Sequence, residues 1–386
     1  MKRSSGSLVF LENSNNVLGM HREDNGIKQE NFADFVFPVI NMIKNEVRVK
    51  RSIGKMINGK FIWNDGKYYE GEFKNNLPNG QGKKFYPTGN ILYQGNFLDG
   101  KFKGKGKYFY DNGNYFIGSY QNGLRVGKGI EYYSNGIIMS DCEYTNGEKE
   151  GNGKYVWEDG QYYMGQWKNN LRHGKGIIYY SNRKIKYEGD FFNDKLEGNG
   201  KYYWENGEYF IGQYKNGWRN GKGVLYYPDG KIKYEGEFIK DKFEGNGKYI
   251  WENGEYYIGQ FKNNLSNGKG KIYYSNGKIH YDGDWKNDKF DGKGIYFWED
   301  GAYYIGQQKN GLRNGKGFQY NSSGLMEYDG DYINDKFDGN GKYVWEDGQY
   351  YTGQWRNNLR HGKGTLYYSD GNIQSNGNWI NDEFTG

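Results

Sequence analysis

The chain contains 386 residues, of which 19% are aromatic, 35% are hydrophobic and 63 are glycine, whereas alanine occurs only at Ala33 and Ala302. This composition argues against a helical domain, because alanine and leucine fill helices while tyrosine, tryptophan and glycine suit strands and tight turns. The formal net charge of +6 combines 53 basic with 47 acidic residues, a balance that argues against a dedicated nucleic-acid-binding protein, and the sequence has no run of about 18 apolar residues that would span a membrane.

The N-terminal part differs in composition from the rest of the chain. Residues 1–30 are polar and poor in aromatic side chains, which predicts a flexible tail, and the apolar run at 8–11 is short for a signal peptide. Residues 31–52 are expected to form a helical or irregular cap that covers the edge of the first strand, and the alternative is a helix that docks a partner. Apolar residues recur there at helical spacing, although a proline would interrupt or start the helix: Phe32, Phe35, Val36, Val39 and Ile43, with Pro38.

From residue 53 to residue 386 the sequence is periodic. The glycine that follows an aromatic residue by two positions first occurs at Gly71, and its later copies follow at steps that alternate between 24 and 23 residues. The repeating unit is therefore 47 residues long and has two similar halves, which gives about 14 halves in all. As a result, YYMGQWKNNLRHGKGIIYYSN at 162–182 returns as YYTGQWRNNLRHGKGTLYYSD at 350–370. Periodicity of this kind is typical of folds in which each unit packs only on its neighbours.

Each half of the unit has the pattern of a β-hairpin. Alternation of period two predicts strands: YYMGQW places Tyr163, Gly165 and Trp167 on one face, and GKGIIYY places Gly176 and Ile178 together on the following strand. A polar loop, KNNLRH, is expected between them, and turn sequences such as EDG, ENG and SNG follow the second strand. Because glycine lets an aromatic ring lie flat on the main chain, we expect the rings of one hairpin to cover the glycines of the next.

The segments YYEGEFKNNLPNGQGKKFYPTG (68–89) and YEGEFIKDKFEGNGKYIWENG (234–254) resemble MORN repeats, whose pattern is Tyr-x-Gly-x-Trp/Phe, a short loop, Gly-x-Gly and an aromatic strand. The resemblance covers roughly residues 68–386, and Cys142 replaces one strand glycine, where we expect a locally looser hairpin. The predicted fold is all-β: an elongated single-layer antiparallel solenoid of β-hairpins over 53–386, with a short N-terminal helical cap.

The sequence predicts no catalytic, cofactor-binding or metal site. His173 and His361 recur in the same motif, LRHGKG, as surface-loop residues, and eight hairpins at about 4.8 Å per strand place them roughly 75 Å apart, too far to share a metal. Carboxylates such as Glu158 and Glu205 lie singly in equivalent turns, whereas an active site needs one special geometry. Cys142 is the sole cysteine, which excludes an internal disulfide and fits a reducing, cytoplasmic location.

The two halves of the unit differ on the face opposite the aromatic residues. In EYFIGQY, Tyr209 and Ile211 are expected to point outward, and equivalent pairs recur about every 19 Å if each unit adds four strands. Exposed apolar patches in register are typical of interfaces, so we expect a ladder of contacts for an elongated protein partner. The alternative is that sheet curvature folds these side chains into a second small core or under their neighbours. The candidate interface residues are Tyr115, Ile117, Tyr162, Met164, Tyr209, Ile211, Tyr256, Ile258, Tyr303, Ile305 and Tyr350.

A second candidate surface is cationic. Four arginines are expected in the loops of the same half, along one edge, where they are candidate contacts for an anionic partner such as a phosphoinositide headgroup. Zwitterionic loops such as NDKLEGNG alternate with them and dilute the charge. These arginines are Arg172, Arg219, Arg313 and Arg360.

Together, these features predict a non-enzymatic structural scaffold that positions partner proteins in a large assembly and binds no nucleic acid. The MORN array resembles those of radial-spoke head proteins in motile cilia and of other cytoskeletal scaffolds, which implies an axonemal or cytoskeletal location. Two alternatives stay open: a phosphoinositide-binding membrane tether, and the regulatory segment of a larger enzyme. Because the sequence stops within a hairpin, the edge from Trp379 to Gly386 is expected to pair with a partner or with a second copy.

Overall fold

The computed structural model describes residues 8–10, 17–20 and 54–386. Every regular element in these ranges is a β-strand, and they contain no helix of the length and apolar character needed to cross a membrane. The predicted cap at 31–52 lies outside the described residues. Within the predicted tail at 1–30, β1 (Leu8–Phe10) and β2 (Val17–Met20) pair antiparallel, and the flexibility of this tail stays a prediction.

The chain divides into two compact units, Met1–Phe109 (unit 1) and Tyr110–Gly386 (unit 2). From residue 54 onward, the strands of unit 1 are β3 (Lys55–Ile57), β4 (Lys60–Ile62), β5 (Tyr68–Lys74), β6 (Leu77–Phe85), β7 (Ile91–Leu98) and β8 (Lys101–Phe109). The strands of unit 2 are β9 (Tyr115–Gln121), β10 (Leu124–Tyr132), β11 (Ile138–Thr145), β12 (Glu148–Val156), β13 (Tyr162–Lys168), β14 (Leu171–Tyr179), β15 (Ile185–Phe192), β16 (Lys195–Tyr203), β17 (Tyr209–Lys215), β18 (Trp218–Tyr226), β19 (Ile232–Ile239), β20 (Lys242–Ile250), β21 (Tyr256–Lys262), β22 (Leu265–Tyr273), β23 (Ile279–Lys286), β24 (Lys289–Phe297), β25 (Tyr303–Lys309), β26 (Leu312–Tyr320), β27 (Met326–Ile333), β28 (Lys336–Val344), β29 (Tyr350–Arg356), β30 (Leu359–Tyr367), β31 (Ile373–Ile380) and β32 (Glu383–Phe384).

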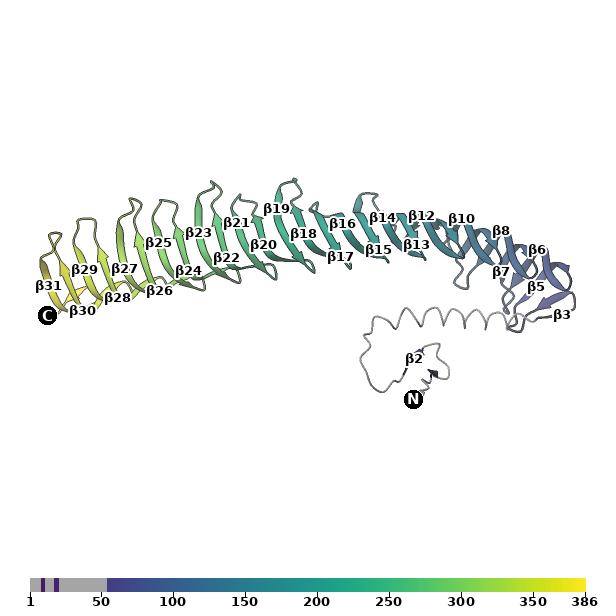
Figure 1. The fold of residues 1–386 in the computed structure, drawn as a ribbon, viewed down its shortest axis with the longest axis horizontal. Helices are drawn as coiled ribbons and strands as arrows, with labels where there is room; N and C mark the ends of the chain where they lie inside the picture. Colours follow the sequence, from purple (N-terminus) through teal and green to yellow (C-terminus); the bar gives the residue numbers. More distant parts are fainter. Residues whose placement is uncertain (1–7, 11–16, 21–53) are drawn as a thin grey trace, which may run out of the picture. The chain divides into compact units, whose positions relative to one another are not determined.

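Within each unit, these strands pair antiparallel with their neighbours in the sequence. The pairing runs from β3 to β8 in unit 1. In unit 2 it runs from β9 to β32, and Figure 1 shows these strands side by side in chain order. At about 4.8 Å per strand, the contour from β9 to β32 is about 110 Å. The predicted all-β, antiparallel array of hairpins is therefore confirmed within each unit.

The connections between the strands of a hairpin are shorter than the sequence suggested. Only Asn169 and Asn170 connect β13 to β14, and both have positive φ (49° and 66°). Two-residue turns of this hand match the right-handed twist of the flanking strands, and asparagine tolerates the conformation. The predicted loop KNNLRH is therefore wrong in extent, because Arg172 and His173 already belong to β14.

The core of most hairpins is one buried aromatic ring over two facing glycines. Tyr163 is fully buried, and Gly165 and Gly176 face each other across β13 and β14. A Cβ atom on either glycine would overlap the Tyr163 ring, so only glycine allows this approach. The phenol of Tyr163 donates a hydrogen bond to the main-chain oxygen of Gln166 (2.8 Å). The rings cover glycines as predicted, but those of their own hairpin rather than those of the next.

Edge-to-face ring contacts join neighbouring hairpins. The Tyr163 ring lies 5.2 Å from that of Phe191, and the Tyr187 ring lies 5.4 Å from that of Tyr214. Such pairs contribute about 0.5–1.5 kcal/mol beyond the area that they bury. The same contacts recur along unit 2, so its core is a row of rings on one face of the sheet, interrupted in β11 where Ser140 takes the ring position. The members that lie over facing glycines are all fully buried: Phe116, Tyr163, Tyr187, Phe210, Tyr234, Tyr257, Tyr281, Tyr304, Tyr328 and Tyr351.

At the C-terminal end, the chain folds back on its own last long strand. Trp379 of β31 pairs with Phe384 of β32, and the N–H of Asn378 donates to the main-chain oxygen of Gly386 (2.9 Å). These residues cover part of the β31 edge. Pairing of the Trp379–Gly386 segment with a partner or a second copy stays a prediction.

Candidate interaction surfaces

A row of side chains crosses the strands of unit 2 on the face opposite the buried rings. Strand pairing places Lys201, Ile211, Val224, Glu235 and Lys248 side by side in this order. The pattern lysine, apolar, apolar, acidic recurs every four strands, or about 19 Å, with departures such as Lys271 at an apolar position and Ile295 at a lysine position. This set and its equivalents form the outer row. Its other apolar members are Ile117, Ile130, Met164, Ile177, Ile258, Ile295, Ile305 and Phe318.

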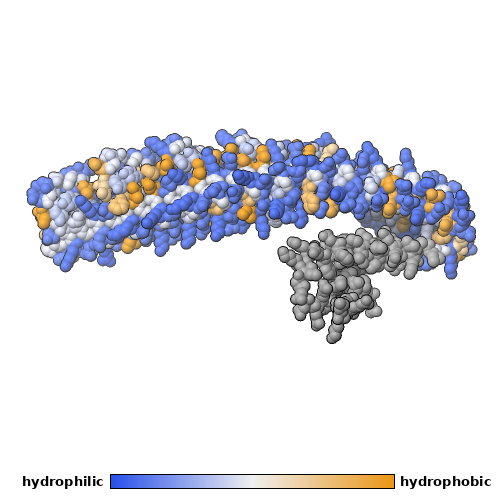
Figure 2. Space-filling model, in the orientation of Figure 1, coloured by the Kyte–Doolittle hydropathy of each residue, from blue (hydrophilic) through white to orange (hydrophobic). Residues whose placement is uncertain are grey.

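Several apolar members of the outer row are exposed to solvent. The exposed fraction is 41% for Ile211, 47% for Met164 and 43% for Ile258, and Ile117 and Ile305 are exposed as well. The alternative that sheet curvature buries these five side chains in a second core is therefore wrong. Figure 2 shows apolar residues on the visible face as separate spots divided by hydrophilic ones. Contact of the outer row with a partner stays a prediction.

The tyrosines predicted to accompany these residues are stacked in pairs. Tyr209 and Tyr226 lie on neighbouring strands with ring centroids 4.4 Å apart and nearly parallel planes, and Lys201 Nζ lies 4.8 Å from the Tyr209 centroid. Each tyrosine is half-buried, so it offers a partner only part of its ring. The pairs recur at Tyr115–Tyr132, Tyr162–Tyr179, Tyr256–Tyr273, Tyr303–Tyr320 and Tyr350–Tyr367.

A shallow groove runs beside the outer row, above the main chain of the facing glycines. Around Met164, Ile177 and Ile211 it encloses about 740 Å³. The same groove recurs three 47-residue repeats later, around Lys342 and Thr352, where it encloses about 390 Å³. An extended segment lying in this groove would contact the outer row and the bare main chain together.

The four predicted arginines lie in strands rather than in loops, which corrects their predicted position. The physical reason is the two-residue turn, after which the strand resumes one residue before each arginine. Arg172 Nε pairs with Asp194 Oδ1 (3.0 Å), and its Nη2 donates to the main-chain oxygen of Asp194 (2.8 Å). The equivalent pairs are Arg219–Asp241, Arg313–Asp335 and Arg360–Asp382, with Nε–Oδ1 distances of 3.1, 3.2 and 3.1 Å.

Each of these guanidinium groups lies in a box of aromatic rings and one carboxylate. Arg219 Cζ lies 5.5 Å from the rings of Trp204 and Phe210 and 5.1 Å from that of Phe238, while Asp241 closes the box. This set and its equivalents are the arginine boxes. Only 17% of the Arg219 side chain is exposed, so the group ties consecutive hairpins together. Sequence reasoning missed the aspartates, although each follows its arginine by 22 residues in every copy.

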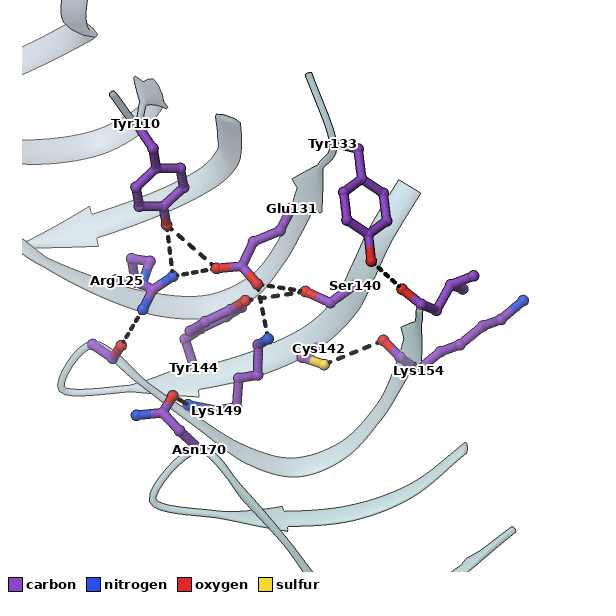
Figure 3. A network of polar contacts seen from close by, with 12 residues as sticks. Tyr110, Arg125, Glu131, Tyr133, Ser140, Cys142, Tyr144, Lys149, Lys154 and Asn170 are labelled. Atoms are coloured by element: carbon purple, nitrogen blue, oxygen red, sulfur yellow. Dashed lines mark hydrogen bonds and ion pairs between the residues drawn. The ribbon is translucent and has the colours of Figure 1, made fainter. Parts of the chain in front are cut away.

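One buried polar network interrupts the repeat in β10, β11 and β12 (Figure 3). Glu131, which is 8% exposed, forms ion pairs with Arg125 Nη1 (2.6 Å) and Lys149 Nζ (2.8 Å) and accepts a hydrogen bond from Ser140 Oγ (2.8 Å). Burial opposes ionisation of Glu131, but the two cations and the hydroxyl outweigh it and lower the pKa of the carboxyl. Arg125 occupies the arginine position of its 47-residue repeat, and Gly147 stands at the position of the usual aspartate. Glu131 therefore supplies the carboxylate that pairs with this arginine.

The single cysteine is buried beside this network. Cys142 is 2% exposed. Two residues earlier, Ser140 takes the position that the core ring of Tyr187 has in the next 47-residue repeat. Since a Cβ atom on Gly153 would overlap Cys142 Sγ, the sulfur fills space above that glycine, and the looser hairpin expected there stays a prediction. Burial raises the pKa of the thiol to about 11, so it stays protonated at neutral pH and is not poised as a nucleophile.

The histidines also lie in strands, so their prediction as loop residues is wrong. His173 in β14 places its ring 5.1 Å from that of Phe192, and His361 takes the same position in β30. His280 Nε2 lies 2.9 Å from the hydroxyl of Tyr296, and burial lowers the pKa of this histidine. In the part of the chain that the structure describes, no group of three or more His, Cys, Asp or Glu side chains is placed to hold a metal ion.

Comparison with known proteins identifies the repeats. The family model described as MORN repeat matches residues 69–91, 93–115, 116–138, 143–162, 163–184, 187–209, 210–232, 234–256, 257–279, 281–303, 304–326, 328–350 and 351–373. Among solved structures, the chain is similar to a mutant of the TCP10 domain of Danio rerio CPAP, at 12% identity over 65% of this chain and 95% of that chain, with a TM-score of 0.18. At that TM-score the similarity supports no conclusion about this chain. No curated protein matches it.

Proposed function

Because the chain belongs to the MORN-repeat family, we propose that it is a non-enzymatic structural scaffold that binds and positions partner proteins along its outer row. The observation that carries this proposal is the outer row itself, in which exposed apolar side chains recur every four strands. Apolar patches in register are typical of interaction surfaces. The buried rings and facing glycines behind the row hold that spacing fixed.

The energetics of the outer row favour an elongated partner over a compact one. Covering one isoleucine that is about two-fifths exposed contributes on the order of 1–2 kcal/mol, which is too little to hold a protein alone. Several such contacts on one rigid array act together, because the first contact raises the effective concentration of the next. A partner whose own contacts repeat at about 19 Å would therefore bind far more tightly than a partner that contacts the outer row in only one 47-residue repeat.

The assembly that we propose for this scaffold is a ciliary axoneme, in a role like that of radial-spoke head proteins, or another cytoskeletal structure. The proposal rests on the resemblance of a MORN array with few other segments to those proteins. Localisation of a tagged copy in ciliated cells tests it. Exclusion of the tagged chain from axonemes and from other cytoskeletal fractions would contradict it.

The membrane-tether alternative has less support. A phosphoinositide site needs cationic side chains that are available to a lipid headgroup. The guanidinium groups of the four boxed arginines instead pair with aspartates, and their side chains are only 17–22% exposed. These pairs favour a protein-binding scaffold, and no feature of the described residues favours a regulatory role within an enzyme.

Substitution in the outer row tests the proposed function. Affinity purification of the tagged chain, followed by quantitative mass spectrometry, should recover partners with the wild type and at least about tenfold less of them with the Ile211→Glu/Ile258→Glu variant, since each lost contact removes on the order of 1–2 kcal/mol. Ile239→Glu is the matched control, because Ile239 is 53% exposed but lies outside the outer row. Equal recovery with the double variant would contradict the proposal.

A further inference from the structure

One arginine box has lost its arginine. The arginine position recurs every 47 residues, and the copy between Arg219 and Arg313 is Ser266. The rest of the box is kept at that position. The residues that correspond to Trp204, Phe210, Phe238 and Asp241 of the Arg219 box are Trp251, Tyr257, Trp285 and Asp288.

A cavity lies where the missing side chain would be. It encloses about 620 Å³, and its lining includes Trp251, Tyr257, Trp285, Ser266 and Asp288. In the filled boxes the same three ring positions stand 4.3–6.0 Å from the guanidinium carbon. The cavity therefore keeps the walls that hold a guanidinium group elsewhere in the chain. This set of five residues is the Ser266 box.

The carboxylate of the Ser266 box keeps its position without an ionic partner. Asp288 Oδ1 accepts a hydrogen bond from the N–H of Ser266 (2.7 Å), just as Asp241 Oδ1 accepts one from the N–H of Arg219 (2.7 Å). In the Arg219 box, Asp241 also accepts from the guanidinium, at Oδ1 (3.1 Å) and at its main-chain oxygen (3.0 Å). Within residues 54–386, Asp288 has no ion pair, so both acceptors stay available to a cation.

Lys289 does not replace the lost arginine. It lines the same cavity, but it forms no ion pair with Asp288 in the described residues. A lysine also follows the aspartate in three boxes that hold an arginine, at Lys195, Lys242 and Lys336. The lysine therefore occurs whether or not the box holds an arginine, and what the Ser266 box lacks relative to those three boxes is the guanidinium group.

We propose that the Ser266 box binds the guanidinium group of an arginine side chain that a partner protein supplies. Aromatic rings attract a planar cation, and one carboxylate with a main-chain oxygen matches the spacing of its N–H groups. Lysine fits less well, because its ammonium is a compact point charge. Residues of three consecutive turns line the cavity, Asn264, Asp288 and Gly311, so it lies at the turn edge of the sheet, where a partner's main chain can lie outside while its side chain enters. That the arginine comes from a partner protein rests on the proposed scaffold function, whereas binding of a guanidinium group does not.

Ligand-observed NMR with N-acetyl-arginine amide tests the proposal on the full chain. We expect saturable binding to the wild type, and at least tenfold weaker binding of N-acetyl-citrulline amide, which has a similar shape without the charge. Ser266→Arg fills the box from within, so it should abolish binding and raise Tm. Asp288→Asn should weaken binding at least tenfold, and it keeps the test valid if Ser266→Arg does not fold. Arg219→Ser opens a second box and should about double the bound signal.

Three results would show that the Ser266 box does not bind a guanidinium group. These are absence of saturable binding to the wild type, unchanged binding to a folded Ser266→Arg variant, and unchanged binding to Asp288→Asn. Agmatine, a free guanidine without a peptide backbone, tests the source of the group: if it binds and the capped arginine does not, the occupant is a small molecule and not a protein side chain. If the wild type binds no guanidinium compound but still recovers its partners through the outer row, this inference is overturned and the scaffold function stands.

Discussion

Replacement of Glu131 by glutamine removes the charge at the centre of the buried network and leaves its two cations without a carboxylate. Arg125 and Lys149 would then be buried without their counter-charge, while Ser140 would keep a possible amide partner. Breaking one partner of a fully buried ion pair costs about 3–5 kcal/mol. The three charged side chains here are 11–23% exposed, so solvent lowers the expected cost of Glu131→Gln to about 2–4 kcal/mol.

Hydrogen exchange is the appropriate assay, because a repeat array opens locally and a single unfolding transition would average over all units. At about 1.36 kcal/mol per factor of ten, exchange of the β10–β12 amides in Glu131→Gln should speed up about 30- to 900-fold, while that of β20–β24 should not change. Glu188→Gln is the matched control, since Glu188 is an exposed acidic member of the outer row. Equal exchange in β10–β12 of Glu131→Gln and wild type would refute the reasoning.

The same network makes the local stability depend on pH. The folded-state pKa of Glu131 is lowered, so its stabilisation is present above the unfolded value of about 4.3 and is lost as the pH falls through the folded value. Protection of the β10–β12 amides should therefore fall below about pH 4 in the wild type more steeply than in Glu131→Gln. Parallel pH profiles for the two proteins would contradict this assignment.

Three further predictions concern the hairpins. Gly176→Ala brings a methyl group into overlap with the Tyr163 ring and should destabilise its hairpin by about 1–3 kcal/mol, measured by hydrogen exchange of the β13–β14 amides; unchanged exchange would contradict the ring-on-glycine core. The thiol of Cys142, with its pKa near 11, should react with iodoacetamide at neutral pH far more slowly in the native chain than in urea, and equal rates would show that it is accessible. Asn170→Val should cost about 1–3 kcal/mol because φ is positive (66°), whereas Asn170→Gly should be tolerated, and equal stabilities would contradict the turn assignment.

The strand pattern was largely predictable from the sequence because its causes are local. The alternation around Tyr163 sets which side chains share a face, and the fixed spacing of Gly165 and Gly176 sets the hairpin register. The turn was predicted too long, since Asn169 and Asn170 alone reverse the chain. The polar composition of this segment does not show that two asparagines are enough to reverse the chain. The tolerance of asparagine for positive φ does indicate it.

The interaction surfaces were predictable only in part, because they depend on contacts between hairpins. The exposure of Ile211 and Ile258 followed from their position in the strand. The ion pair of Arg219 could not be predicted in this way, because its partner Asp241 lies in the next hairpin and no local pattern connects the two residues. Alignment of the repeats to one another carries this information, and the same alignment reveals the serine that stands in the arginine position at Ser266.

Site-specific photo-cross-linking tests the scaffold function most directly. A photoreactive amino acid is placed at Ile211 or at Ile258, which are equivalent positions one unit apart on the outer row, and at Ile239 as the control. We predict that Ile211 and Ile258 cross-link the same partner protein, at two sites on that partner separated by about 19 Å, and that Ile239 does not. Absence of a partner cross-link at both outer-row positions, or an equal yield at Ile239, would contradict the function proposed for this array.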